Sequence, residues 1–217
     1  MVVTVPRSDN NNIFVNPHRN LGYLLNDSQY WGYGSGSGGG GVNTDCIILK
    51  NLAINVNCND IIRFEQDYKN RMAASEKAIF ESMSRAQQLG YLFNAQKASW
   101  KAKELFPNSL RNGKGDAFRH AYWNGLNEIL LGDALATNLA TAHEDKPPIY
   151  AYSNKEKQMD LFNNSVGRSR SNWLSNGYSS LSESILDAMS NGELRYLSHL
   201  HGGISRATNQ SQLIPTN

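Results

Sequence analysis

Residues 113–124, GKGDAFRHAYWN, are the stretch around which this 217-residue chain is organised. Residues three and four apart share one face of a helix, so Asp116, His120 and Asn124 fall on one stripe, and the opposite stripe is apolar around Phe118. We predict that the apolar side faces the core. The polar side is a candidate working face, because an imidazole transfers protons near neutral pH. The alternative is a hydrogen-bonded, half-buried network that only fixes packing.

The composition limits the classes of protein to which the chain can belong. With 40% hydrophobic residues, it can bury one sizeable core. Its formal net charge is +2 and its basic residues are scattered, so there is no strong nucleic-acid signature. No apolar stretch approaches the ~20 residues that span a bilayer, so no transmembrane segment is expected. The start of the chain lacks the charged-then-apolar order of a signal peptide, so secretion cannot be inferred from it.

The composition also divides the chain into three segments. Residues 1–44 are rich in Asn, Ser and Gly and contain a polyglycine run, which predicts a flexible arm or linker. Residues 45–58, DCIILKNLAINVNC, are β-branched and partly alternate apolar with polar positions, which predicts a short strand or hairpin. Residues 59–217 are expected to form a helical catalytic domain.

Cys46 and Cys58 flank the predicted strand. In an oxidising compartment this placement closes a hairpin disulfide, and in a reducing compartment it leaves two ordinary thiols. We favour the disulfide. Because both cysteines lie outside the helical region, we expect no nucleophilic thiol in the site.

Helical periodicity and capping residues predict a succession of helices after the strand. Starts are expected near residues 59, 75, 113, 133, 153 and 179, and stops at Pro107, Gly132 and Pro147. The glycines of the loop 108–115 suit either an anion or a tight turn. The predicted fold is mainly α, an antiparallel helical bundle with a short N-terminal β-hairpin or strand element.

Three successive helices carry ionisable or amide groups beside their packing faces, and we expect these groups to meet inside the bundle. A divalent metal (Zn, Ca or Mn) is one interpretation, and a metal-free His-Asp general base is the other. The candidate metal ligands are Asp116, His120, His143, Glu144 and Asp160. The candidate catalytic residues are His120, His143, Asp160, Arg119 and Arg168. The supporting polar network is Asn124, Asn163, Asn164 and Trp123.

Several well-known catalytic motifs are missing from the sequence. There is no His-Glu-x-x-His, no cysteine pairs at zinc-finger spacing, no Gly-x-Ser-x-Gly elbow and no Walker loop. A water activated by metal or histidine is therefore the simplest nucleophile to expect.

Three blocks of sequence resemble an uncharacterised bacterial domain family. They are GDAFRHAYWN at 115–124, AHE at 142–144 and MDLFNNSVGR at 159–168. The resemblance covers residues 60–215 and is to domains of secreted and surface-associated proteins of the Bacteroidetes type. Their place at the C-terminal end of larger chains is similar to that of toxin or effector domains in bacterial competition.

This resemblance implies an effector-type hydrolase, secreted or on the cell surface, that acts on an envelope component such as phospholipid or peptidoglycan. It also implies a cognate immunity protein as a partner. The alternatives are a nuclease-type toxin and a non-enzymatic binding or structural module. An enzyme predicts that His120, His143 and Asp160 line a cleft open to solvent, whereas a module predicts a closed core.

Overall fold

The structure is a computed structural model that describes residues 44–52, 54, 58–147 and 152–217. The predicted arm, residues 1–44, lies outside the described residues except for its last position. The described part is mainly α-helical, as predicted. Its elements are α1 Thr44–Asn51, α2 Cys58–Lys69, α3 Ala74–Ser82, α4 Arg85–Leu105, α5 Lys114–Leu131, α6 Asp133–His143, α7 Ser153–Ser169, α8 Leu181–Ser190, β1 Arg195–Leu197 and β2 Leu213–Pro215.

The prediction of a strand or hairpin at residues 45–58 is wrong. Residues 45–51, the first half of this segment, belong to helix α1, and Cys58 already begins α2. Asp45 in the first turn and Lys50 in the last turn of α1 suit the helix dipole. Leu49 is buried in a small hydrophobic cluster with side chains of α2 and α4. Tertiary packing thus overrides the β propensity of the isoleucines, which is an effect that the local sequence does not reveal.

Helix α1 is also held by Arg85 at the start of α4. The guanidinium donates to both oxygens of Asp45, at 2.9 and 2.7 Å, and to both oxygens of Glu65, at 2.9 and 2.7 Å. The hydrogen bonds from Arg85 lower the pKa of Asp45 below its ordinary value. Cys46, in the same helix, is disulfide-bonded, which is the state favoured from the sequence.

The two strands lie at the C-terminal end of the chain. They pair antiparallel, with Arg195 opposite Pro215 and Leu197 opposite Leu213. Asn163 of α7 fastens β1 to the helices, because its side-chain amide donates to the carbonyl oxygen of Arg195 at 2.8 Å and accepts from its N–H at 2.9 Å. Strands of three residues leave no alternation to detect, so the sequence did not reveal this sheet.

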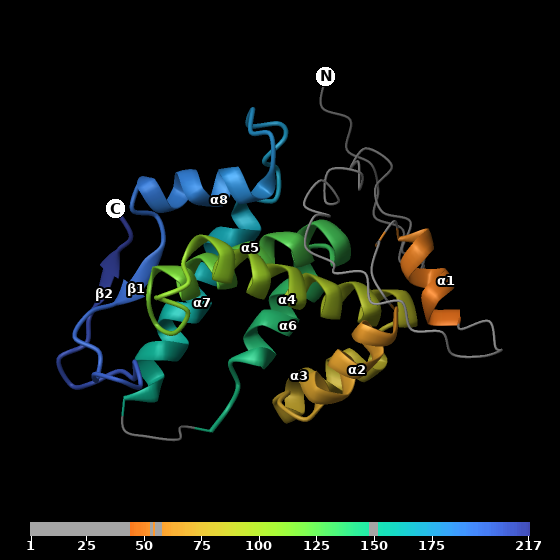
Figure 1. Cartoon of the computed structure of the whole chain (residues 1–217), viewed down its shortest axis with the longest axis horizontal. Coiled ribbons are helices and arrows are strands. Elements are labelled where there is room, and N and C mark those ends of the chain that lie inside the picture. Colours follow the sequence, from red (N-terminus) through yellow and green to blue (C-terminus); the bar gives the residue numbers. More distant parts are fainter. Residues whose placement is uncertain (1–43, 53, 55–57, 148–151) are drawn as a thin grey trace.

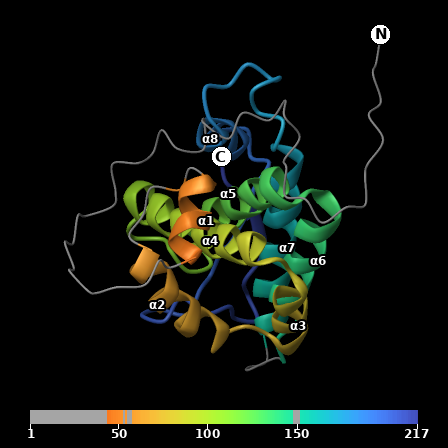
Figure 2. The ribbon, with the colours of Figure 1, turned by 90° about the vertical axis from the view of Figure 1, so that its right-hand side faces the viewer.

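Helix α5 is at the centre of the fold. Its most extensive contacts are with α7 and α4, and it also touches α6, α8 and β1. Figure 1 shows it at the middle of the ribbon, and Figure 2, turned by 90°, places it between α8 and α4. The helix is buried on both sides and not only on its apolar side: Asp116, His120 and Asn124 are as inaccessible to solvent as Phe118. The polar stripe must therefore be satisfied by other helices.

A glycine sets the distance between α5 and α7. A Cβ atom on Gly167 would lie 1.9 Å from the carbonyl oxygen of Ala121, and one on Gly125 would lie 2.9 Å from that of Gly167. A side chain at Gly167 would therefore push the two helices apart. The close approach brings Asn164 and Asp160, one and two turns before Gly167, to the polar stripe of α5.

The main hydrophobic core joins α3, α4, α5, α6 and α8. Its largest fully buried side chains include Tyr91, Phe80 and Phe118. Every helix in the described part of the chain is too short or too polar to cross a bilayer.

Candidate functional site

The imidazole of His120 on α5 is the centre of the candidate site, and only 3% of its side chain is exposed. Nε2 lies 2.8 Å from Nη2 of Arg119 and 3.3 Å from Oδ1 of Asp160. Oδ1 of Asp116 is 3.6 Å from the same nitrogen. On the other side of the ring, Nδ1 lies 3.2 Å from Oδ1 of Asn164. Helices α5 and α7 thus surround the ring with four polar side chains.

These contacts determine the tautomer of the ring. A guanidinium only donates hydrogen bonds, so Nε2 of His120 accepts from Arg119 and carries a lone pair. The proton is then on Nδ1, where Oδ1 of Asn164 accepts it. Burial, together with the positive charge of Arg119, lowers the pKa of His120 well below its ordinary value. The imidazole is therefore neutral.

Three carboxyl groups gather around the ring. Asp116 accepts from Arg119 and from the backbone N–H of Asn112, the latter at 2.6 Å. Oδ1 of Asp160 and Oε1 of Glu144, at the end of α6, are buried and have no hydrogen-bond donor in the described part of the chain. Oε1 of Glu144 lies 3.8 Å from Nδ1 of the ring. In two of the three carboxyl groups, one buried oxygen therefore lacks the donor that a buried anion needs.

These two carboxyl groups, Asp160 and Glu144, have raised pKa values. Burial raises the pKa of Asp160 well above its ordinary value, and the nearby Asp116 and Glu144 raise it further. Burial also raises the pKa of Glu144. At the same time, the lone pair on Nε2 of His120 faces the oxygens of Asp116 and Asp160. Three electron-rich atoms that converge in this way repel one another unless a proton or a cation lies between them. Arg119 supplies part of this positive charge, because its Nη2 donates to Nε2 of His120 and to Oδ1 of Asp116, whereas Oδ1 of Asp160 has no donor among the described residues.

A metal ion is one cation that fits this arrangement. One ligand atom each from Asp116, His120 and Asp160 lies within 4.8 Å of the others, so this buried group can hold a metal. Of the five predicted ligands, the structure brings these three together in a group that can hold a metal. His143 and Glu144, the other two, lie outside this group.

His143, at the end of α6, has a different partner. Its Nδ1 lies 2.9 Å from Oε2 of Glu76, which is fully buried on α3. Oε1 of Glu76 accepts from the hydroxyls of Tyr91, at 2.8 Å, and Tyr68, at 3.4 Å. Burial by itself would raise the pKa of Glu76, but the hydrogen bonds from His143 and Tyr91 lower it below its ordinary value. The ring centroids of His143 and His120 are 6.5 Å apart, so the two groups are neighbours.

Sequence reasoning missed two residues around the site. Glu76 follows Ser75 at the start of a predicted helix, where an acidic residue is ordinary, and its contact with His143 joins positions 67 residues apart. Asn112 also went unnoticed, although an Asn before a Gly in a loop is a turn signal. Its φ of 56° directs its N–H towards Asp116.

The predicted supporting amides are partly where they were expected. Nδ2 of Asn124 donates to Oδ1 of Asn164, at 2.6 Å, and to the carbonyl oxygen of His120, at 3.1 Å. Nη1 of Arg168 donates to Oδ1 of Asn124 at 3.2 Å, so this arginine reaches the ring only through two amides. Asn163 of α7 lies apart from the site, because its side chain bonds to the backbone of Arg195 in β1.

Trp123, the fourth predicted supporting residue, lies beside the second histidine. Its ring meets His143 edge to face, with the centroids 4.9 Å apart, and it also contacts Tyr91 at 5.2 Å. Its indole N–H is buried and has no acceptor among the described residues. Trp123 therefore supports the Glu76 and His143 pair and not the carboxyl groups around His120.

The loop before α5 forms a tight turn. The N–H of Gly115 donates to the hydroxyl of Ser109 at 2.9 Å, and the N–H of Asp116 donates to the carbonyl oxygen of Ser109 at 3.1 Å. A Cβ atom on Gly115 would lie 2.8 Å from Cβ of Phe106. These N–H groups at the start of the helix are thus engaged within the loop, which favours the turn over an anion site.

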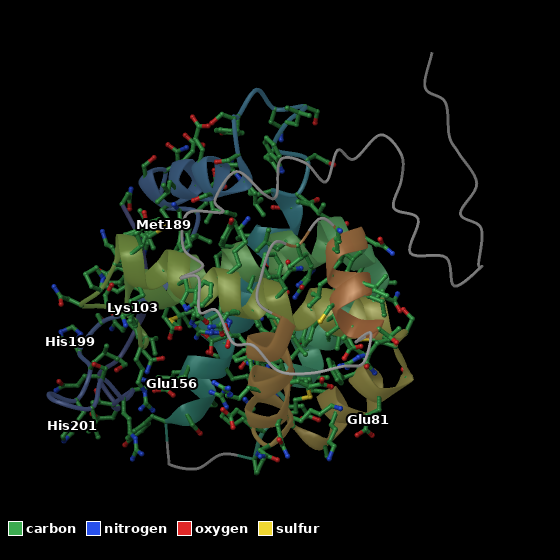
Figure 3. All side chains as sticks on the ribbon, turned by 45° about the vertical axis from the view of Figure 1, so that its right-hand side comes forward. Glu81, Lys103, Glu156, Met189, His199 and His201 are labelled. Atoms are coloured by element: carbon green, nitrogen blue, oxygen red, sulfur yellow. The ribbon has the colours of Figure 1, made fainter. Side chains whose placement is uncertain are left out.

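Two further histidines, His199 and His201, lie on the exposed loop between β1 and β2 (Figure 3). Glu156 at the start of α7 fastens this loop, because its Oε1 accepts from the N–H of Ala207 at 3.0 Å and from the side chain of Asn112. These two histidines therefore belong to the surface of the molecule and not to the candidate site.

A cavity of about 280 Å³ adjoins the site. Arg119 and His143 line it, whereas His120 and Asp160 do not. Of the three residues that an enzyme was expected to place in an open cleft, only His143 lines this cavity. The side chain of His120 is 3% exposed and that of Asp160 is 14% exposed, and Arg119 lies between His120 and the cavity.

Residues 79–193 match the family model of a domain of unknown function, DUF6973. The match includes α4 to α8 and every residue of the group around His120, whereas Glu76 falls outside it. No curated protein and no solved structure matches the chain. The predicted resemblance to an uncharacterised domain family is confirmed to this extent.

Proposed function

We propose that this chain, which belongs to the DUF6973 family, is a hydrolase that uses a divalent metal ion held by Asp116, His120 and Asp160. The observation that carries the proposal is that Nε2 of the neutral His120 ring lies close to Oδ1 of Asp116 and Oδ1 of Asp160, and that the oxygen of Asp160 has no donor among the described residues. One nitrogen and two oxygens suit zinc or manganese better than calcium, which prefers oxygen ligands throughout.

A metal ion in this position would supply a nucleophile, because it lowers the pKa of a bound water towards neutrality. Glu144, whose pKa is raised by burial, is the nearby group suited to accept the proton of that water. Arg119 lies between the metal group and the cavity, where it can stabilise negative charge that develops on a substrate. The water oxygen would form the new bond to the substrate, and the leaving group would depart with a proton.

The family resemblance is the basis on which we also propose a substrate class and a location. We propose an effector-type enzyme, secreted or on the cell surface, that cleaves a component of the bacterial envelope, either phospholipid or peptidoglycan, and that is restrained by an immunity protein. The disulfide at Cys46 supports an oxidising compartment. A nuclease is the less favoured enzymatic alternative, because the net charge of +2 gives little attraction to a polyanion.

A non-enzymatic module remains the second candidate, and one observation favours it. His120 is buried and does not line the cavity, which is the arrangement expected of a polar network that fixes helix packing. In that case Asp160 would carry a proton in place of a metal ion.

Metal content separates the two candidates. We expect wild-type protein dialysed against zinc, manganese or calcium to retain about one equivalent by mass spectrometry, and Asp160→Asn, which keeps the shape of the side chain, to retain none. His199→Ala removes an exposed histidine outside the group and should leave the metal content unchanged. A folded wild type that retains no metal after all three treatments would refute the metal site. Loaded protein is then assayed on phospholipid vesicles, peptidoglycan and nucleic acid.

A further inference from the structure

The cavity beside the site has one apolar wall and one cationic wall. Trp123 and Ala98 are buried members of the apolar wall, and Met72 lies partly exposed on it. Arg71 and Lys146 also line the cavity and are exposed. The polarity of the cavity therefore changes from apolar, where it is buried, to positively charged, where it meets solvent.

Two of the cationic side chains that line the cavity, Arg71 and Lys146, have no carboxylate partner among the described residues. Glu76 is the one carboxylate that lines it, and its oxygens already accept from His143 and two tyrosines. Neither Arg71 nor Lys146 forms an ion pair with a carboxylate in the part of the chain that the structure describes. The side-chain N–H of Arg71 donates only to the carbonyl oxygen of Asp67, at 3.1 Å.

Arg119 adds a third cationic group, whose charge is partly balanced by Asp116. It belongs to both regions, because its Nη2 contacts Asp116 and His120 while the side chain lines the cavity. Three cationic groups around one opening suit a ligand with several acceptor oxygens and more than one negative charge, and a phosphate is such a group.

We propose that this cavity binds a phosphate ester whose other part is a short apolar chain or ring. The phosphate would lie at the opening, on Arg71, Arg119 and Lys146, and the apolar part would pack against Trp123 and Met72. A volume of about 280 Å³ is at the lower end of the range for ligand pockets, so only a small apolar group fits inside. The binding itself is independent of catalysis, whereas the view that the bound ester is the substrate rests on the proposed function.

Isothermal titration with hexyl phosphate at pH 8, in buffer with EDTA, tests the proposal. We expect wild-type protein to bind hexyl phosphate at least tenfold more tightly than inorganic phosphate, hexanol or hexyltrimethylammonium. The double variant Arg71→Gln/Lys146→Gln should lose at least tenfold in affinity. A matched double variant, Arg63→Gln/Lys77→Gln, removes the same charges from exposed positions that do not line the cavity, and it should bind as the wild type does. Met72→Gln should weaken hexyl phosphate but not inorganic phosphate.

Two results would overturn the proposal. The first is equal affinity of the two double variants for hexyl phosphate, and the second is a preference of the wild type for the cationic or the uncharged ligand. Because EDTA removes any metal and no turnover is measured, failure of the proposed hydrolase activity leaves this test intact. Co-sedimentation with vesicles that contain phosphatidic acid identifies the source of the ester. If the wild type sediments with these vesicles and the Arg71→Gln/Lys146→Gln variant does not, the ester is a lipid. If the wild type binds hexyl phosphate but does not sediment with the vesicles, the ester is a soluble molecule.

Discussion

Two buried pairs of a histidine and a carboxyl group lie next to each other in this molecule, and they are opposite in electrostatic character. In the first, Glu76 faces His143, and its two oxygens accept from three side chains. In the second, Asp160 faces His120, and Oδ1 of Asp160 accepts from none among the described residues. The pKa of Glu76 is lowered, and that of Asp160 is raised.

The difference shows that several hydrogen bonds together can outweigh the effect of burial on a carboxyl group. Burial raises the pKa in both places, but only Glu76 has the hydrogen bonds to reverse its effect. The pair of Glu76 and His143 is therefore complete within the protein. The pair of Asp160 and His120 needs an added proton or cation, and this makes it the better candidate for chemistry.

Gly167→Ala should have the largest effect, because it separates the two helices that carry the second pair, Asp160 and His120. The new Cβ would lie 1.9 Å from a backbone oxygen of α5, so the helices that carry His120 and Asp160 must separate. We expect a loss of about 3 kcal/mol or more in the free energy of unfolding, measured by urea denaturation. Gly202→Ala, where nothing lies within 4 Å, is the control and should be close to neutral. A variant as stable as the control would show that α5 and α7 do not touch as described.

Glu76→Gln should have the next largest effect, because it disturbs the pair that is complete. The new amide nitrogen replaces one acceptor, which leaves at least one buried donor from His143, Tyr91 or Tyr68 without a partner. The expected cost is about 1–3 kcal/mol in urea denaturation. Glu81→Gln on the exposed side of the same helix should change stability by less than about 0.5 kcal/mol. Equal costs for the two variants would contradict the role given to Glu76.

Asp160→Asn should have a smaller effect in the metal-free protein, and it sharpens the comparison. The amide keeps the shape of the side chain, and the change removes a carboxyl group that has no donor on Oδ1. In EDTA we expect the free energy of unfolding to stay within about 1 kcal/mol of the wild type or to rise. A loss comparable with that of Glu76→Gln would mean that Asp160 has a compensating partner.

The smallest expected effect is a change with pH in the destabilisation caused by Glu76→Gln and by Asp160→Asn. The two changes should have opposite signs. The pKa of Glu76 is lowered by folding, so its stabilisation is present above its ordinary value of 4.5 and is lost as the pH falls. The pKa of Asp160 is raised by folding, so its stabilisation is present below 3.8 and is lost as the pH rises. Between pH 4 and 7, in EDTA, the cost of Glu76→Gln should increase and that of Asp160→Asn should decrease. Parallel trends would contradict the opposite pKa shifts.

Much of the helical fold could be predicted from the sequence, because its signals are local. Pro107 and Gly132 end helices where they were expected to do so, and periodicity placed the stretch up to Leu105 in a helix. Helix α1 and the C-terminal sheet could not be predicted in this way. The first depends on burial of Leu49 against other helices, and the second on strands of three residues.

The candidate site was predictable where one helix supplies the residues. Spacing of four residues brought Asp116, His120 and Asn124 together correctly. Prediction of contacts between helices was less reliable. Asn163 and Asn164 are adjacent in sequence, but successive residues of a helix are rotated by about 100°, so the side chain of Asn163 contacts β1 and that of Asn164 contacts His120. Glu76 could not be found at all, because its partner is distant in the chain.

The ion pairs that join Arg85 to Asp45 of α1 and to Glu65 make the local opening of α1 sensitive to salt. One guanidinium binds both Asp45 and Glu65, and its side chain remains 32% exposed, so dissolved ions screen the contact. Amide hydrogens of α1 should therefore exchange with solvent faster as the ionic strength rises, while those of the buried helix α5 should not respond. Local opening at this end of the described chain would then be controlled by salt, independently of the interior.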